Sequence, residues 1–485
     1  MGSLLRSFYW HDYETFGMNP ALDWPSQFAG IRTDADLNEI GEPLNIFCKQ
    51  PRDHLPHPMA ALITGLSPQA VNEKGIIEPE FIRHIHQEFM VPGTCGVGYN
   101  SLRFDDEVTR HSLYRNFYDP YAREWKNGNS RWDLIDMVRL AGALRPEGIE
   151  WPVRNDGCKS FRLEELTAAN SIDHGDAHDA LSDVRATIAL ARLVRNRQPK
   201  LFNYVLGLRN KHAVSQLLNM TEKNIVVHVS GMFGGYRNNL ALVMPLVNHP
   251  TNKNGVIVYD LAINPAPMLE LSAEQIRERL FTPLDQLPEG VERIPLKTVH
   301  INKCPVIVTT AVLSHKNKEQ LNIDLALCEQ HRSMLLNDHS LAAKIQTVLS
   351  ERPGFETSDP EQMLYSGGFF TPQDRTAMNQ VIASSPQELA QPSMGFRDPR
   401  LEEMLFRYRG RHYPQTLDQE DQIVWMQYCK DRLTGVLHND DRVLTFKNYD
   451  AAMDEARLVA GDDMDKHMLL QQLAEYNQQL QRELL

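Results

Sequence analysis

The sequence lacks the long apolar run that a membrane-spanning helix requires. Of its 485 residues 42% are hydrophobic, yet none of its apolar stretches approaches the roughly 18 residues of a membrane helix. The opening residues, MGSLLRSFYWHDYE, contain no apolar run followed by a small-residue cleavage site, so we expect no secretory signal. We therefore expect no membrane partner, and the length predicts about three domains.

The sequence also lacks clustered cysteines. Its six cysteines are Cys48, Cys95, Cys158, Cys304, Cys328 and Cys429, and no two of them form a C-x-x-C pair. This spacing argues against a disulfide framework and against a zinc site. We expect small buried thiols in a protein of the reducing cytoplasm.

An excess of positive charge, common among nucleic-acid-binding proteins, is missing as well. The formal net charge is −13. Because phosphate responds to the local potential and not to the total, a nucleic-acid-binding function requires basic residues gathered on one face. The acidic remainder would lie elsewhere or hold metal.

The chain contains three successive segments with different secondary-structure patterns. Residues 1–198 alternate strand-like and helix-like patterns, which predicts an α/β domain. Residues 199–352 contain short β-favouring runs separated by turn formers, which predicts a small β-rich barrel or sandwich. Residues 353–485 begin with a segment typical of a linker and continue as a mainly helical pattern.

Two acidic residues lie two positions apart in the first predicted strand, SFYWHDYETFG. Alternate residues of a strand point to the same face, so Asp12 and Glu14 should lie together. Close carboxylates repel one another unless a proton or a cation lies between them. A D-x-E pair alone more often decorates a solvated strand surface, so a metal site requires further residues.

Further acids and a histidine supply that context. Asp105 follows the segment GYN, where a strand has turned into a helix. His178 and Asp183 stand at the start of the strongest predicted helix, and inside it they would be splayed by about 140°. We therefore place His178 in the preceding loop and Asp183 in the first turn. Asp106 and Glu107 are rivals for the role of Asp105, and we expect them on the solvated face of their helix.

D-x-E, a distant D and H-x-x-x-x-D, in this order, resemble the DEDD exonuclease superfamily in its histidine-containing branch. The likeness to bacterial exonuclease I is carried by HDYETFG, GYNSLRFDDEVTR, NSRWDLIDMVRLAGALRPEGI, SFRLEELTAAN, NKHAV, VHVSGMFGGYR and HINKCP. It extends over nearly the whole chain. The resemblance implies an α/β ribonuclease H-like exonuclease domain at 1–198, an SH3-like β-rich domain at 199–352 and an α-helical C-terminal domain at 353–485.

The resemblance implies an exodeoxyribonuclease that degrades single-stranded DNA from its 3′ end, processively and to 5′-mononucleotides, in DNA repair and recombination. Two Mg²⁺ ions, or Mn²⁺ in their place, would supply the attacking group and neutralise developing charge. Their ligands would be Asp12, which bridges the ions, Glu14, Asp105 and Asp183. His178 would be the general base, so activity should fall below a pH of about 6.5.

Residues 110–145 interleave basic and aromatic side chains, the combination that binds single strands independently of sequence. The aromatic residues are Tyr114, Phe117, Tyr118, Tyr121, Trp125 and Trp132, and we expect about half of them in the core. The resemblance implies that Glu14 contacts the substrate. It also implies contacts from six further residues: Arg110, Tyr121, Trp125, Arg139, Arg162 and Lys303. Among these, Arg162 is the candidate for gripping a phosphate near the scissile bond.

The resemblance also implies a partner, the acidic C-terminal tail of single-stranded DNA-binding protein, which ends in phenylalanine. Arg145 beside a hydrophobic pocket would suit its terminal carboxylate. We expect a monomer. Two other functions stay open: an exoribonuclease of the same superfamily, and a catalytically inactive single-strand-binding scaffold. The two accessory domains argue against the first, and the complete set of catalytic residue types argues against the second.

Overall fold

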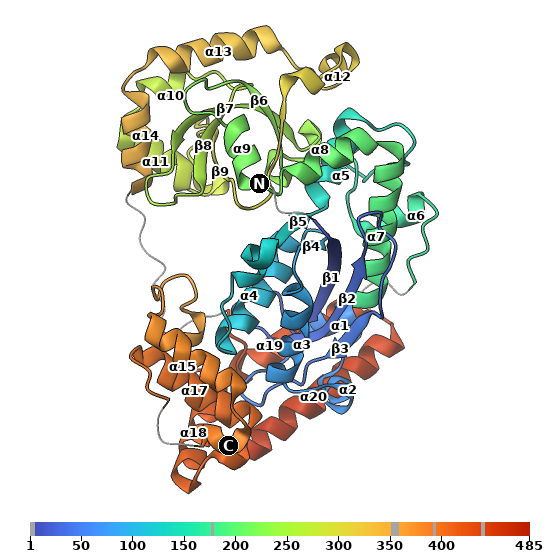
Figure 1. Cartoon of the computed structure of the whole chain (residues 1–485), viewed down its shortest axis with the longest axis vertical. Coiled ribbons are helices and arrows are strands. Elements are labelled where there is room, and N and C mark those ends of the chain that lie inside the picture. Colours follow the sequence, from blue (N-terminus) through green and yellow to red (C-terminus); the bar gives the residue numbers. More distant parts are fainter. Residues whose placement is uncertain (1–4, 176–178, 351–357, 391–393, 438–441) are drawn as a thin grey trace. The chain divides into compact units, whose positions relative to one another are not determined.

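The computed structural model describes residues 5–175, 179–350, 358–390, 394–437 and 442–485. The chain divides into two compact units. One unit comprises Met1–Ser130, His174–Ile188 and Phe355–Leu485, and the other comprises Arg131–Asp173 and Ala189–Gly354. Figure 1 shows the N-terminal strands in blue, the β-rich region in green and yellow, and the C-terminal helices in orange and red.

The first unit is built on strand β1 (Ser7–Thr15), the strand predicted to carry Asp12 and Glu14. It pairs in antiparallel fashion with β2 (Pro25–Thr33) and in parallel with β4 (Thr94–Gly98), while β3 (Leu44–Phe47) extends the sheet beyond β2. Every residue of β1 is buried except Asp12, which is partly exposed. This burial explains the aromatic character of the strand.

Helices pack against this sheet. They are α1 (Pro58–Thr64), α2 (Pro68–Lys74), α3 (Glu78–Phe89) and α4 (Asp105–Arg115). Rings of Tyr9, Tyr13 and Phe28 from the strands meet Phe81 and Phe89 of α3 in one core cluster. Helix α7 (Ala180–Arg197) belongs to the first unit at its N-terminal end and to the second at its C-terminal end.

The predicted helical C-terminal segment is confirmed, and it belongs to the first unit (Figure 1). Its helices are α15 (Pro372–Ala383), α16 (Pro386–Leu389), α17 (Pro399–His412), α18 (Gln419–Thr434), α19 (Phe446–Ala460) and α20 (Met464–Leu484). Helices α19 and α20 contact α1 and α2. Trp425, Tyr449 and Leu473 share a core cluster with Leu55 and Ala61.

The second unit contains an antiparallel sheet of order β10-β6-β7-β8-β9. The strands are β6 (Val226–Val229), β7 (Leu240–Asn248), β8 (Gly255–Asp260), β9 (Leu296–His300) and β10 (Val306–Thr309). The chain enters this unit through β5 (Ser130–Asp133). The sheet confirms the prediction that this part of the chain is rich in β-strands.

Helices precede, interrupt and follow that sheet. Before it lie α5 (Ile135–Leu144), α6 (Leu163–Ala169), α8 (Pro199–Gly207) and α9 (Lys211–Leu217). Later in the chain are α10 (Ala266–Glu270), α11 (Ala273–Phe281), α12 (His315–Gln320), α13 (Leu325–Asn337) and α14 (Leu341–Ser350). We did not predict the later group, although Ser272 and Gln275 form a capping box at α11 and Asp324 caps α13. Across the described ranges, the structure has no helix long and apolar enough to cross a membrane.

A buried ion cluster joins the early and late parts of the first unit. The guanidinium of Arg411 on α17 donates to Asp53 Oδ2 at 2.8 Å and to Glu361 Oε2 at 2.7 Å. Arg411 also lies over the ring of Trp24, 5.0 Å from its centroid. Burial alone would raise the pKa of Asp53, but Arg411 and His54 outweigh burial and hold that pKa well below its usual value. The cluster therefore depends on all of its charges being present.

Replacing Arg411 by alanine should destabilise the first unit by about 3–5 kcal/mol, because the buried Asp53 loses its paired guanidinium and Glu361 keeps only Arg407. Urea unfolding followed by tryptophan fluorescence reports this, since Trp24 and Trp425 both lie against Arg411. Because the pKa of Asp53 is lowered on folding, its contribution exists above the ordinary pKa of about 3.9 and is lost as the pH falls further. The deficit of the variant should therefore shrink in acid.

The control is Arg457→Ala, which removes an exposed pair with Asp454 and should cost less than about 1 kcal/mol. Equal losses for the two variants would contradict a special role for the buried cluster.

Candidate active site

Strand β1 presents Asp12 and Glu14 on one face, as their spacing predicts. One carboxylate oxygen from each of Asp12, Glu14 and Asp183 lies within 4.8 Å of the other two. Glu14 is buried, whereas Asp12 and Asp183 are partly exposed. The structure therefore brings residues of β1 and α7 together, although they are far apart in the sequence.

Asp183 lies in the first turn of α7, as predicted. The turn is begun by Asp179, whose carbonyl accepts the amide of Asp183 at 3.0 Å and whose Oδ2 accepts the amide of Ser182 at 3.2 Å. Asp183 Oδ1 also contacts Nε2 of His174. The predicted general base, His178, lies outside the described residues.

Asp105 is the first residue of α4 and is buried. Its Oδ1 accepts the backbone amide of Tyr13 at 3.1 Å. Tyr13 lies between Asp12 and Glu14 on β1, so this bond holds the Asp105 carboxylate against the strand that carries both of them. Thr109 donates to the Asp105 carbonyl at 2.8 Å and steadies the turn.

The electrostatics of the cluster favour a bound cation. Burial raises the pKa of Glu14 to about 9, and the carboxylates of Asp183, Asp105 and Asp179 add to the rise. Burial and the same neighbours, with Glu14, raise the pKa of Asp12 well above its usual value. Oxygen ligands in this arrangement fit hard divalent ions such as Mg²⁺ or Mn²⁺, which would remove the repulsion.

The expectation that Asp106 lies on a solvated helix face is wrong. Asp106 is 1% exposed, and its Oδ1 accepts Nη2 of Arg123 at 2.5 Å. Glu107 is only partly exposed, and its Oε1 accepts Nη1 of Arg110 at 2.8 Å. Arg110 is itself buried and makes two further bonds to Glu124 at 2.7 and 2.9 Å. A DNA contact through Arg110 stays a prediction, and the guanidinium already holds two carboxylates.

About half of the six aromatic residues lie in the core, as expected, and Tyr118 is partly buried against the core cluster of the first sheet. Tyr114, Phe117 and Trp132 are buried. Tyr121 is partly exposed beneath the guanidinium of Arg110, and Trp125 is 65% exposed. Trp125 is therefore accessible for stacking.

The remaining predicted contacts lie in the second unit. The side chain of Arg162 is 72% exposed and faces Glu165 at 3.6 Å. Arg139 pairs with Asp136 at 2.7 Å, and Lys303 is exposed. Arg145 Nη2 donates to the carbonyl of Val312 at 2.9 Å. The role of each in binding stays a prediction.

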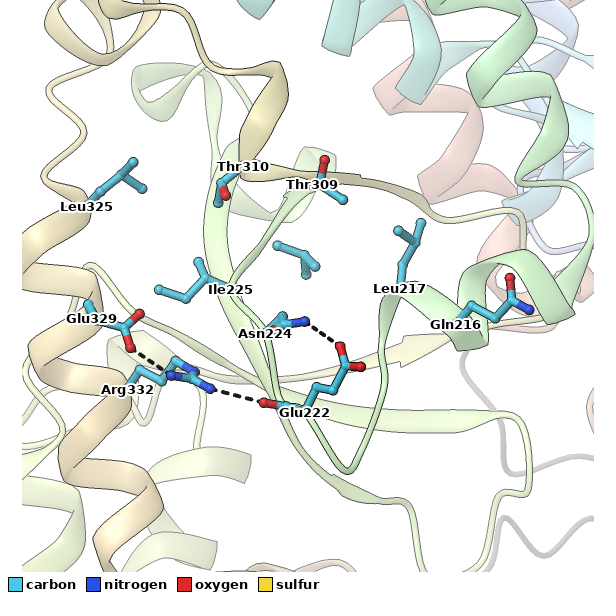
Figure 2. A pocket seen from close by; sticks show the side chains of 11 residues that line it. Gln216, Leu217, Glu222, Asn224, Ile225, Thr309, Thr310, Leu325, Glu329 and Arg332 are labelled. Carbon is cyan, nitrogen blue, oxygen red and sulfur yellow. Dashed lines mark hydrogen bonds and ion pairs between the residues drawn. The ribbon is translucent and has the colours of Figure 1, made fainter.

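A pocket of about 540 Å³ opens in the second unit. Figure 2 shows apolar side chains of Leu217, Ile225 and Leu325 on its walls, and Arg332 held by Glu329 and by a backbone oxygen at Glu222. Thr310 also lines it and belongs to the turn η7 (Thr310–Val312), whose last carbonyl Arg145 holds. The lining is therefore mixed, because these apolar side chains share it with Arg332, two glutamates, two amides and two threonines.

Sequence reasoning missed three residues around the carboxylates. Asp179 had a signal, because aspartate directly before a helix is a favoured N-cap. His174 contacts Asp183, but nothing in the sequence distinguished it from His178 as a neighbour. Gln27 on β2 donates to Asp179 Oδ1 at 2.9 Å, a contact that depends on strand register.

Comparison with known proteins covers almost the entire chain. Residues 9–191 match the family described as Exonuclease, residues 209–351 the Exonuclease I SH3-like domain and residues 358–480 the Exonuclease I C-terminal domain. The chain is 44% identical to exodeoxyribonuclease I of Escherichia coli over 482 residues, covering 99% of each protein.

Solved structures of exonuclease I are also similar to this chain. Exonuclease I from the moderately thermophilic Methylocaldum szegediense is 51% identical, with a TM-score of 0.92 over 98% of this chain and 99% of that one. The zinc-ion-bound complex of Escherichia coli exonuclease I with single-stranded DNA is 44% identical, with a TM-score of 0.92 over 98% and 99%. These likenesses confirm the predicted fold class.

Replacing Asp12 by asparagine should stabilise the metal-free protein, because one of several repelling carboxylates is removed. A gain of about 1 kcal/mol corresponds to about 2–4 °C in melting temperature for a unit of this size. Melting in EDTA measures this gain. Added Mn²⁺ should raise the melting temperature of the parent protein and not that of the variant.

The exposed change Glu42→Gln serves as the control and should alter neither measurement. A variant that melts lower in EDTA and still gains stability from Mn²⁺ would refute the cation site.

Proposed function

The chain belongs to the exonuclease I family, and we propose that it removes nucleotides from the 3′ end of single-stranded DNA by hydrolysis at the carboxylate cluster. It is an exodeoxyribonuclease. The observation that carries the proposal is the convergence of Asp12, Glu14 and Asp183 within 4.8 Å. Such a cluster is costly unless cations occupy it.

Divalent cations are the cofactor, and we propose two Mg²⁺ ions, with Mn²⁺ as a substitute. Asp12, Glu14, Asp105 and Asp183 would hold them, with Asp12 shared between the two. When bound, the ions would activate water and neutralise charge on the reacting phosphate. Zn²⁺ is bound in the related Escherichia coli complex, so it should compete for this site.

The protein's own residues would position the water and the strand. We propose His178 as the general base and Glu14 as a contact to the terminal nucleotide. Trp125 would stack on a base, with Tyr121 and Arg110 beside it in the first unit. In the second unit Arg162 would bind a phosphate near the scissile bond, and its exposed guanidinium supports this assignment. Arg139 and Lys303 would contact the strand farther along.

We further propose three domains, 1–198, 199–352 and 353–485, in a monomer of the bacterial cytoplasm that acts processively in DNA repair and recombination. The family matches at residues 9–191, 209–351 and 358–480 support this division. The two compact units cut across this division, because the C-terminal helices belong to one unit with the N-terminal sheet, whereas residues 131–173 and 189–198 belong to the other unit with the β-rich region.

A second proposal concerns a partner, the acidic tail of single-stranded DNA-binding protein. Arg145 would attract its terminal carboxylate, and the pocket in Figure 2 would accept its phenylalanine. The apolar side chains in the pocket, and the bond from Arg145 to the turn η7 that also carries the lining residue Thr310, support this.

Single strands labelled at the 3′ or the 5′ end test the activity directly. We expect immediate release of the 3′ label, a shortening ladder from the 5′ label, and arrest by EDTA. Asp12→Ala should slow cleavage by at least about 10²- to 10³-fold, the usual cost of losing one electrostatic group, while the affinity for DNA in EDTA stays unchanged.

A matched RNA oligonucleotide separates the exoribonuclease alternative. Faster digestion of RNA than of DNA would favour it, and an unchanged rate for Asp12→Ala would show that the reaction occurs elsewhere.

Binding of the tail is measured with a fluorescent acidic peptide that ends in phenylalanine. Arg145→Ala should weaken binding about tenfold, equivalent to about 1.4 kcal/mol, and amidation of the peptide terminus should have a similar effect. Arg154→Ala, an exposed arginine of the same unit, is the control. Equal affinity of the amidated and free peptides would reject carboxylate recognition.

A further inference from the structure

We propose that Gln27 is a positioning residue for the metal ligands: it holds Asp179 at the start of α7 so that Asp183 faces Asp12 and Glu14. The inference rests on the proposed function, since it concerns how the cation site is assembled. Gln27 touches neither the reacting atoms nor the cations in this proposal.

Strand register places Gln27 beside the cluster. Gln27 on β2 lies directly opposite Glu14 on β1, and opposed residues of an antiparallel pair share one face of the sheet. The side chain is 2% exposed. Gln27 is therefore a buried amide on the face of the sheet that carries the carboxylates.

Two bonds fix the direction of that amide. Gln27 Nε2 donates to Asn45 Oδ1 at 3.0 Å and to Asp179 Oδ1 at 2.9 Å. Asn45 belongs to β3, so one hydrogen of the amide is anchored within the sheet and the other reaches the end of α7. The amide thus connects the sheet to the helix.

Asp179 transmits that position to Asp183. One carboxylate oxygen accepts from Gln27 and the other from the Ser182 amide, while the Asp179 carbonyl accepts the amide of Asp183. Moving Asp179 therefore moves the first turn of α7. A helix terminus held at both its backbone and its cap has little freedom to rotate the Asp183 carboxylate away.

The bond also fixes where the charge of Asp179 lies. Asp179 is one of the carboxylates that raise the pKa values of Asp12 and Glu14. The two neutral donors, the Gln27 amide and the Ser182 backbone amide, hold this carboxylate in place without cancelling its charge. Second partners of this kind typically change metal affinity about 10- to 100-fold when lost.

The test exchanges donor and acceptor. Gln27→Glu opposes two carboxylates, whereas the double variant Gln27→Glu/Asp179→Asn restores one hydrogen bond with its direction reversed. Gln27→Met removes the donor while filling the same volume. Gln387→Glu makes the same chemical change as the first variant at an exposed residue of α16 and is the control. Melting temperatures establish that each variant is folded.

The main measurement is Mn²⁺ binding by calorimetry, with DNA affinity in EDTA as the second. We expect Gln27→Glu and Gln27→Met to bind Mn²⁺ about 10- to 100-fold more weakly, with DNA affinity unchanged. The double variant should recover about tenfold of the loss. Recovery by the reversed pair, with DNA binding unaffected throughout, identifies positioning as opposed to general loosening of the fold.

Two results would overturn the inference: Mn²⁺ affinity of folded Gln27→Met or Gln27→Glu equal to that of the parent, or no recovery in the double variant. Either leaves the proposed function standing. A parent protein that neither binds Mn²⁺ nor shortens single-stranded DNA would instead refute the proposed function itself.

Discussion

Mutual repulsion among closely spaced carboxylates is the constraint on which the structure of the first unit depends. Asp12, Glu14 and Asp183 approach within 4.8 Å, and Asp105 is fastened to the same strand through the amide of Tyr13. Such a group cannot hold itself together, so its supports come from packing and from hydrogen bonds outside the group. The aromatic packing of β1 fixes Asp12 and Glu14, the capped end of α7 fixes Asp183, and the first turn of α4 fixes Asp105.

Three consecutive acids on α4 show how local geometry separates roles. Successive helix residues point about 100° apart, so neighbours meet different surroundings. Asp105 faces β1, Asp106 is buried against Arg123, and Glu107 meets Arg110 at the edge. Only the first is proposed as a metal ligand, although all three offer the same chemistry.

Much of the site was readable from the sequence because it depends on local periodicity. The two-residue repeat of a strand paired Asp12 with Glu14, and helix geometry placed Asp183 in the first turn of α7. Contacts set by strand register or by distant packing were not readable. The burial of Asp106 depends on Arg123, and the Gln27 bond depends on which residues of β1 and β2 lie opposite. The helices between residues 266 and 350 were missed because the strand-like runs around them dominated the pattern.

The ion cluster around Arg411 can form only late in the synthesis of the chain. Asp53 precedes Arg411 by 358 positions. The ribosome therefore synthesises the buried carboxylate long before the arginine that pairs with it. Until the last quarter of the chain has been made, the loop between β3 and α1 carries a carboxylate without its arginine partner, and α1 and α2 lack the C-terminal helices that contact them. The first unit can therefore finish folding only after the C-terminal helices have been synthesised. A chain that ends before Arg411 would lack the positive charge that pairs with Asp53.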